Sequence, residues 1–193
     1  KPCWEKRGFI VRFVLIFILF FFFITSKAYS DLTKQIINNL ENSENYRFKF
    51  IQQINGKKET GDCILVFDKK INCKYDNLGK ILISNGKNII IKSNNSDIPN
   101  FYKLENTSFY KLLDKRYLIN ELKMNNIKNQ NDKIFVKITY QNFDIKVFFD
   151  KEKLYLKGWQ TTDIYNNSVF TEIKIMSVNE IIDENLFNLK KFN

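Results

Sequence analysis

The sequence contains no histidine, and its 193 residues include only six glycines and two prolines. Without histidine, the chain lacks the commonest general base and the commonest non-sulfur metal ligand, so no Ser-His-Asp or Cys-His arrangement can form. The six glycines build no phosphate-binding loop motif. The carboxylate pair Asp183-Glu184 falls where a polar surface turn is expected. These features predict a protein that is not an enzyme and has no catalytic residue, metal site or cofactor.

Arginine is also scarce. The chain has a net charge of +10, yet only four of its 31 basic residues are arginine. Arginine is the better side chain for phosphates and base edges, and the lysines are spread along the chain rather than clustered. We therefore expect a solvated lysine surface and no nucleic-acid partner, with weak attraction to an anionic membrane as a lesser alternative.

The first thirty residues predict export. A basic start (Lys1, Lys6, Arg7, Arg12) precedes an uncharged apolar run over 14–24 and small residues at 26, 28 and 30. This order is typical of a secretory signal peptide, and the run is shorter than the roughly 20 residues that span a bilayer. We expect residues 1–30 to be cleaved, with an uncleaved membrane anchor as the alternative. Removing their five basic residues and one glutamate leaves 26 basic and 20 acidic residues, a net charge of +6.

Residues 31–193 then form one exported domain with two cysteines, Cys63 and Cys73. In a hairpin centred on position 68 these two residues lie opposite each other, close enough to bridge. An even pair in an exported chain predicts a disulfide; two buried thiols are the alternative. No cysteine follows the apolar run to carry a lipid anchor, so we expect the domain to be soluble.

The pattern after residue 30 is mostly β. Residues 31–43 place apolar side chains on one helical stripe, and Asp31 can cap the start. From Tyr46 onward the apolar period is two. Besides a short helix over 107–115 and a loop over 94–106, we expect strands at 46–50, 62–67, 70–76, 80–84, 88–93, 117–126, 132–140, 143–149, 153–161 and 169–178. These predict an antiparallel sheet, open or curled into a barrel.

Aromatic residues are abundant: nineteen Phe, nine Tyr and two Trp. Seven of the Phe lie in the predicted signal peptide, and the rest fall largely on alternate strand positions. They predict either a filled core or a concave face that is partly empty for an apolar ligand.

From Phe48 to Phe187 the chain resembles the LolA family of periplasmic lipoprotein carriers. The resemblance lies in the order of several short motifs. They are the aromatic strand 48–53, Gly61 opening a strand, the hairpin strand 70–75, the segment 81–86, Thr107-Ser108-Phe109 with Leu112-Leu113, Leu156 with Gly158, Trp159 and Asp163, and a closing Leu186-Phe187.

The resemblance implies an α+β fold that is mainly antiparallel β: a strongly curved open half-barrel covered by short lid helices. It also implies a non-enzymatic periplasmic chaperone that carries lipoproteins from the inner to the outer membrane, with their acyl chains in an apolar cavity. Its partners would be acylated lipoproteins, an inner-membrane lipoprotein release complex and an outer-membrane acceptor, and it would be a monomer. Strand alternation and the lid motif give the candidate cavity residues: Phe48, Phe50, Leu65, Ile71, Tyr75, Ile83, Leu112 and Leu113.

The chain departs from the family at three positions. Phe67-Asp68 stand where many members have Arg-Pro at the hairpin tip, so any latch on the lid must be made by other groups. Cys73 replaces a large apolar residue, and Ser108 replaces a proline. The alternative function is a non-enzymatic envelope protein with a filled β core, whose sheet edge pairs with a partner strand.

Overall fold

The structure of the protein, a computed structural model, describes residues 31–67, 69–76, 79–94, 98–125, 127–130, 133–163 and 167–192. The predicted signal peptide and Asp68 lie outside the described residues. No helix in the described part of the chain is long and apolar enough to span a bilayer.

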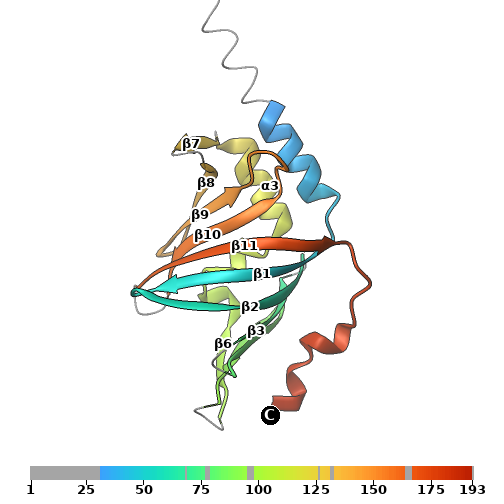
Figure 1. The fold of residues 1–193 in the computed structure, drawn as a ribbon, viewed down its shortest axis with the longest axis vertical. Helices are drawn as coiled ribbons and strands as arrows, with labels where there is room; N and C mark the ends of the chain where they lie inside the picture. The colour runs from blue at the N-terminus through green and yellow to red at the C-terminus, as the bar shows by residue number, and fades with distance from the viewer. Residues whose placement is uncertain are drawn as a thin grey trace, which may run out of the picture.

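An eleven-stranded antiparallel sheet makes up most of the fold and is not closed into a barrel (Figure 1). Its strand order is β6-β5-β4-β3-β2-β1-β11-β10-β9-β8-β7. Neighbours in sequence are therefore neighbours in the sheet except β6 and β7, which form its two edges, and the first and last strands, β1 and β11, pair with each other. The strands are β1 (Asn45–Ile54), β2 (Lys57–Val66), β3 (Lys70–Tyr75), β4 (Ile81–Asn85), β5 (Asn88–Lys92), β6 (Asn100–Lys103), β7 (Lys128–Gln130), β8 (Lys133–Tyr140), β9 (Phe143–Phe149), β10 (Leu156–Thr162) and β11 (Ser168–Val178). This is consistent with the predicted open, curved half-barrel.

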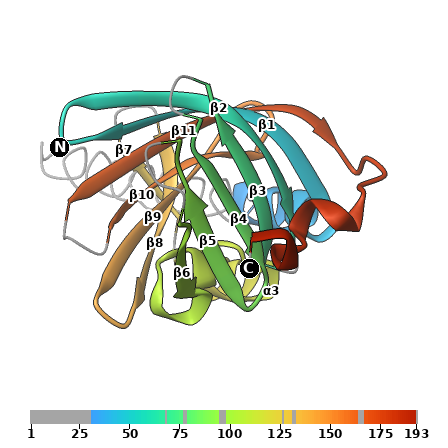
Figure 2. The same ribbon diagram turned by 90° about the horizontal axis from the view of Figure 1, so that it is seen from below.

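The chain crosses from one sheet edge to the other through a helical segment, which we call the helical cover (104–124). It comprises η1 (Leu104–Asn106), α2 (Phe109–Leu112) and α3 (Lys115–Met124). The cover starts at the end of edge strand β6 and leads to edge strand β7. Seen from below, the sheet curves around this segment (Figure 2). The open side of the sheet is therefore covered by the connection between its two edges.

The helix α3 corrects the strand predicted over 117–126. Leu118, Ile119 and Leu122 are buried and follow helical spacing, so one face of the segment packs on the core. Asp114 caps its first turn, because its side chain accepts a hydrogen bond from the Tyr117 backbone N–H at 3.0 Å. The predicted loop over 94–106 likewise contains β6 and η1.

The main core lies between the inner face of the sheet and two helical segments. Phe48 pairs with Cys63, Cys63 with Cys73, and Cys73 with Leu82, so this row of side chains shares one face across four strands. The N-terminal helix (31–41) adds the buried side chains of Ile36 and Leu40 to the same core.

The structure contains the predicted disulfide between Cys63 and Cys73, whose α-carbons are 4.1 Å apart. The two residues are paired directly across the β2–β3 hairpin, as the hairpin register predicts. Both lie in the main core, so the bridge faces the inside of the sheet.

A second, smaller core covers the outer face at β4 and β5. The C-terminal segment, η2 (Glu184–Phe187) and η3 (Leu189–Phe192), packs there, with Leu189 against Ile83 and Ile90. Two polar contacts fix it: the Asn72 side chain donates to the Leu186 carbonyl at 2.6 Å, and Lys70 pairs with Glu184 at 2.7 Å. This part of the sheet is therefore buried on both faces.

Candidate functional site

An apolar cavity of about 230 Å³ lies between the inner face of the sheet and the start of α2. Strands β4, β5, β9 and β10 and the helix α2 supply its apolar walls, with the side chains of Leu82, Ile89, Ile91, Phe109, Phe143 and Trp159. These positions share the inner face because Leu82 pairs with Ile91 and Trp159 lies in the row of Val147 and Thr171. The site can hold an apolar ligand by burying its surface.

Trp159 is the largest side chain of this wall, and its position follows from local sequence. Gly158 precedes it with φ +154°, and a β-carbon there would collide with the Thr171 carbonyl of β11. Only glycine lets β10 approach β11 this closely next to the bulge between Leu156 and Gly158. The indole ring meets the rings of Phe48 and Phe109 edge to face, at 6.3 and 6.4 Å between centroids. The sheet and α2 thus fix the indole from two sides.

A row of polar side chains crosses one wall of the cavity. The Tyr75 hydroxyl donates to Gln52 Oε1 at 3.4 Å, and Gln52 Nε2 donates to Thr171 Oγ1 at 3.1 Å. Lys80 lies over the Tyr75 ring at 3.9 Å and pairs with Glu59 at 2.6 Å. Burial, followed by the Glu59 charge, raises the pKa of Tyr75 above its usual value, so this hydroxyl stays protonated.

An ion pair joins the β2–β3 hairpin to the helical cover. Lys69 Nζ lies 2.9 Å from Asp114 Oδ2 and 4.4 Å from the Tyr110 ring centroid. Burial opposes ionisation of both groups, but their mutual attraction and the Tyr117 N–H prevail. The pKa of Asp114 is therefore lowered, and that of Lys69 is raised. Lys69 thus links the cover to the hairpin tip, two residues after Phe67, which stands where the LolA resemblance places an arginine.

Of the eight predicted cavity residues, Tyr75 lines this cavity. Six others are buried in the main core and fill the space between sheet and cover: Phe48, Phe50, Leu65, Ile71, Leu112 and Leu113. Ile83 is a correction, because it lies on the opposite face of the sheet. It pairs with Asn72, between Ile71 and Cys73, and packs against Leu189 in the outer core.

Trp159 and Phe109 belong to the LolA-like motifs of the sequence but were not among the eight predicted cavity residues. Both are large aromatics at positions that face the inside, Trp159 on β10 and Phe109 at the start of α2. The available signal was the glycine before Trp159, since a glycine within a strand marks a bulge or a close backbone approach.

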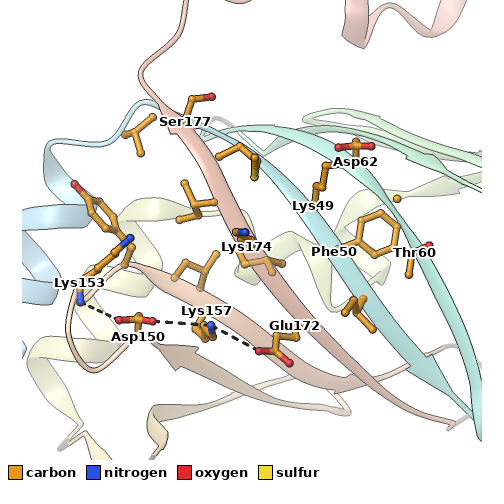
Figure 3. Close-up of a pocket in the computed structure, with 18 of the residues that line it drawn as sticks. Lys49, Phe50, Thr60, Asp62, Asp150, Lys153, Lys157, Glu172, Lys174 and Ser177 are labelled. Atoms are coloured by element: carbon orange, nitrogen blue, oxygen red, sulfur yellow. Dashed lines mark hydrogen bonds and ion pairs between the residues drawn. The ribbon is translucent and has the colours of Figure 1, made fainter.

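A larger hollow of about 850 Å³ lies over the outer face of β1, β2, β10 and β11 (Figure 3). Charged side chains of both signs line it beside exposed apolar ones such as Ile51 and Met176, and Lys157 contacts both Asp150 at 3.9 Å and Glu172 at 3.7 Å. Its size exceeds that of the inner cavity, but an acyl chain bound there would strip water from these charged groups, which costs free energy. We therefore assign the candidate site to the inner cavity. In the described ranges no three His, Cys, Asp or Glu residues are grouped to hold a metal ion.

No protein-family model matches the chain, and no curated protein matches it significantly. Similar solved structures include a LolA superfamily protein from Nitrosomonas europaea, 4% identical, which covers 83% of this chain and 97% of its own with a TM-score of 0.44. A DUF1329 family protein from Desulfovibrio piger is 8% identical, covers 86% and 98%, and has a TM-score of 0.46. The Mycobacterium tuberculosis lipoprotein LppX is 15% identical, covers 81% and 98%, and has a TM-score of 0.42. These likenesses are too distant to carry an argument about function, which depends on the cavity of this chain.

Proposed function

We propose that this protein is a carrier of acyl chains, and that its cargo is the lipid part of lipoproteins. One observation carries the proposal: an apolar, aromatic-walled cavity lies between the inner face of the sheet and a helical cover. An ion pair at the hairpin tip, Lys69 with Asp114, links the cover to the sheet. A site of this kind binds by burying apolar surface and needs no catalytic group.

The energetics suit a carrier. An acyl chain in water costs about 0.8 kcal/mol per exposed CH₂ group, so a sixteen-carbon chain costs roughly 12 kcal/mol. A protein that transports such a chain between membranes must offset most of this and still release it. The empty form covers its own apolar wall with α2, which lowers the free energy of the unloaded state.

The helical cover must move to admit cargo. At about 230 Å³ the cavity is small, since pockets for drug-sized ligands measure about 300–1,000 Å³. Phe109 forms part of the wall and belongs to the cover, so displacement of α2 enlarges the cavity directly. We infer that the cover acts as a lid, with the closed form described here as its resting state.

The complete proposal places the protein in the periplasm after removal of residues 1–30. It would take lipoproteins from an inner-membrane release complex and deliver them to an outer-membrane acceptor as a monomer. The predicted signal peptide and the LolA resemblance of the motifs support this route.

The test is purification of the tagged protein from cells that express the full chain, followed by solvent extraction and mass spectrometry of the bound material. Stoichiometric recovery of triacylated lipoproteins supports the carrier. Recovery of a polypeptide partner without acyl chains contradicts it.

A second candidate is a non-enzymatic envelope interaction protein. It is favoured by the filled main core and by edge strand β6, where the Phe101 side chain is 48% exposed. An exposed edge strand can pair with a strand of another chain. The same purification separates the two candidates, because only the carrier retains lipid.

A further inference from the structure

Trp159 has a buried hydrogen-bond donor that the described part of the chain does not satisfy. The side chain is 4% exposed and lines the cavity, and its Nε1–H finds no acceptor among the described residues. Buried polar groups are almost always paired, and an unpaired one costs about 1–3 kcal/mol. Such an exception at the wall of a binding cavity indicates a group that the ligand completes.

The neighbouring polar groups of the cavity are already satisfied. Gln52 bonds to Thr171, Tyr75 bonds to Gln52, and Lys80 is paired with Glu59. Among these polar groups of the cavity wall, Trp159 is therefore the one whose hydrogen-bond donor lacks a partner within the described ranges. Because the rings of Phe48 and Phe109 contact the indole edge to face, it cannot rotate freely to find another acceptor.

We propose that Trp159 Nε1–H donates a hydrogen bond to the carbonyl oxygen of an acyl ester or amide in the cavity. This inference rests on the proposed carrier function and specifies its ligand. The indole nitrogen is a donor only, so it selects a ligand with an acceptor. An uncharged carbonyl provides this acceptor without the desolvation cost of a free carboxylate.

The geometry makes the hydrogen bond a determinant of ligand class. A saturated chain without a carbonyl would fill the apolar space but leave the indole unpaired. Lipids with an ester- or amide-linked acyl chain satisfy both the wall and the donor. A ligand without a carbonyl is then disfavoured because it leaves the buried indole N–H unpaired.

The test compares methyl palmitate with nonadecane, an alkane that has the same number of non-hydrogen atoms and no acceptor. Each is delivered from cyclodextrin to the full chain, and affinity is measured by titration calorimetry. We expect Trp159→Phe to weaken binding of the ester about five- to tenfold, as a net hydrogen bond of about 1 kcal/mol or slightly more implies, and to leave binding of the alkane unchanged. Phe101→Leu, at an exposed edge-strand position outside the cavity, should change neither affinity.

A second measurement needs no stable variant at Trp159. In a nitrogen–proton correlation spectrum, the indole N–H signal of Trp159 should move downfield with the ester and not with the alkane. An ester affinity that Trp159→Phe does not lower, with no such movement in the unaltered protein, overturns the hydrogen bond and leaves the carrier function standing. Failure of both probes to bind overturns the carrier function and the inference with it.

Discussion

The ion pair between Lys69 and Asp114 should control how often the helical cover opens. Both side chains are mostly buried, 25% and 21% exposed, and lie 2.9 Å apart. Exposed pairs contribute about 0.2–1 kcal/mol and hydrogen bonds to charged groups more, so we take about 1 kcal/mol for this pair. Lys69→Met removes the charge but keeps most of the aliphatic side chain that lies near Tyr110.

Losing about 1 kcal/mol from the closed state multiplies the open population about fivefold. If ligand enters only the open form, its association rate rises by the same factor. The assay is stopped-flow quenching of tryptophan fluorescence by a brominated acyl ester. We expect Lys69→Met to bind about fivefold faster than the unaltered protein.

Two variants serve as controls. Lys70→Met removes a neighbouring lysine whose partner, Glu184, lies in the C-terminal segment and not in the cover; it should leave the rate unchanged. Asp114→Asn should match Lys69→Met, because asparagine keeps the cap on Tyr117 while removing the charge. Equal rates for Lys69→Met and Lys70→Met, with both variants folded, would refute the reasoning.

Three further predictions concern pH, the disulfide and a glycine. The pKa of Asp114 is lowered in the folded protein, so the stabilisation that its carboxylate gives to the closed cover is complete above the unfolded pKa of 3.8 and is lost as pH falls through the lower folded pKa. The rate of ligand entry should therefore be constant from pH 7 to about 5 and increase below about pH 4. Asp114→Asn should abolish this increase. Replacing Cys63 and Cys73 by serine should lower the free energy of unfolding by about 2–3 kcal/mol in urea titrations, because the bridge closes a short loop; an unchanged midpoint contradicts this. Gly61→Val should cost more than about 2 kcal/mol, since a β-carbon there would collide with the backbone carbonyl of Lys74 and with the Phe50 ring. Unfolding at the original midpoint would count against it.

The β2–β3 hairpin could be predicted from the sequence because its information is local. Two cysteines at equal distance from a turn fix the register, and the structure pairs them directly. Strand β9 was predicted with its observed bounds, Phe143–Phe149. Where one residue pair or turn sets the geometry, pattern alone is sufficient.

Ile83 could not be oriented from the sequence. Strand β4 begins Ile81-Leu82-Ile83, with no alternation, because the strand is buried on both faces. A strand of this kind is apolar throughout and gives no indication of which side faces inward. The information lies about a hundred residues away, in the Leu189 side chain that covers the outer face.

Helix α3 and most of the residues that line the cavity were missed for a related reason. Tyr117 and its neighbours have aromatic and branched side chains that suit a strand, and only the capping by Asp114 and the packing of Leu118 and Leu122 decide for a helix. The six core residues predicted for the cavity do face the inside of the sheet. Whether such a side chain packs in the core or lines the cavity depends on the volume that α2 leaves unfilled, which the sequence pattern does not give.

The C-terminal segment should make one part of the sheet much slower to open than the helical cover. By covering Ile83 and Ile90, it leaves the β4–β5 hairpin shielded on both sides. The backbone amides of the β4–β5 hairpin should therefore exchange hydrogen with solvent only through global unfolding, whereas the backbone amides of the helical cover exchange through local opening. A ligand that enters beneath α2 would then meet one wall that yields within a transport cycle and another that stays in place for the lifetime of the fold.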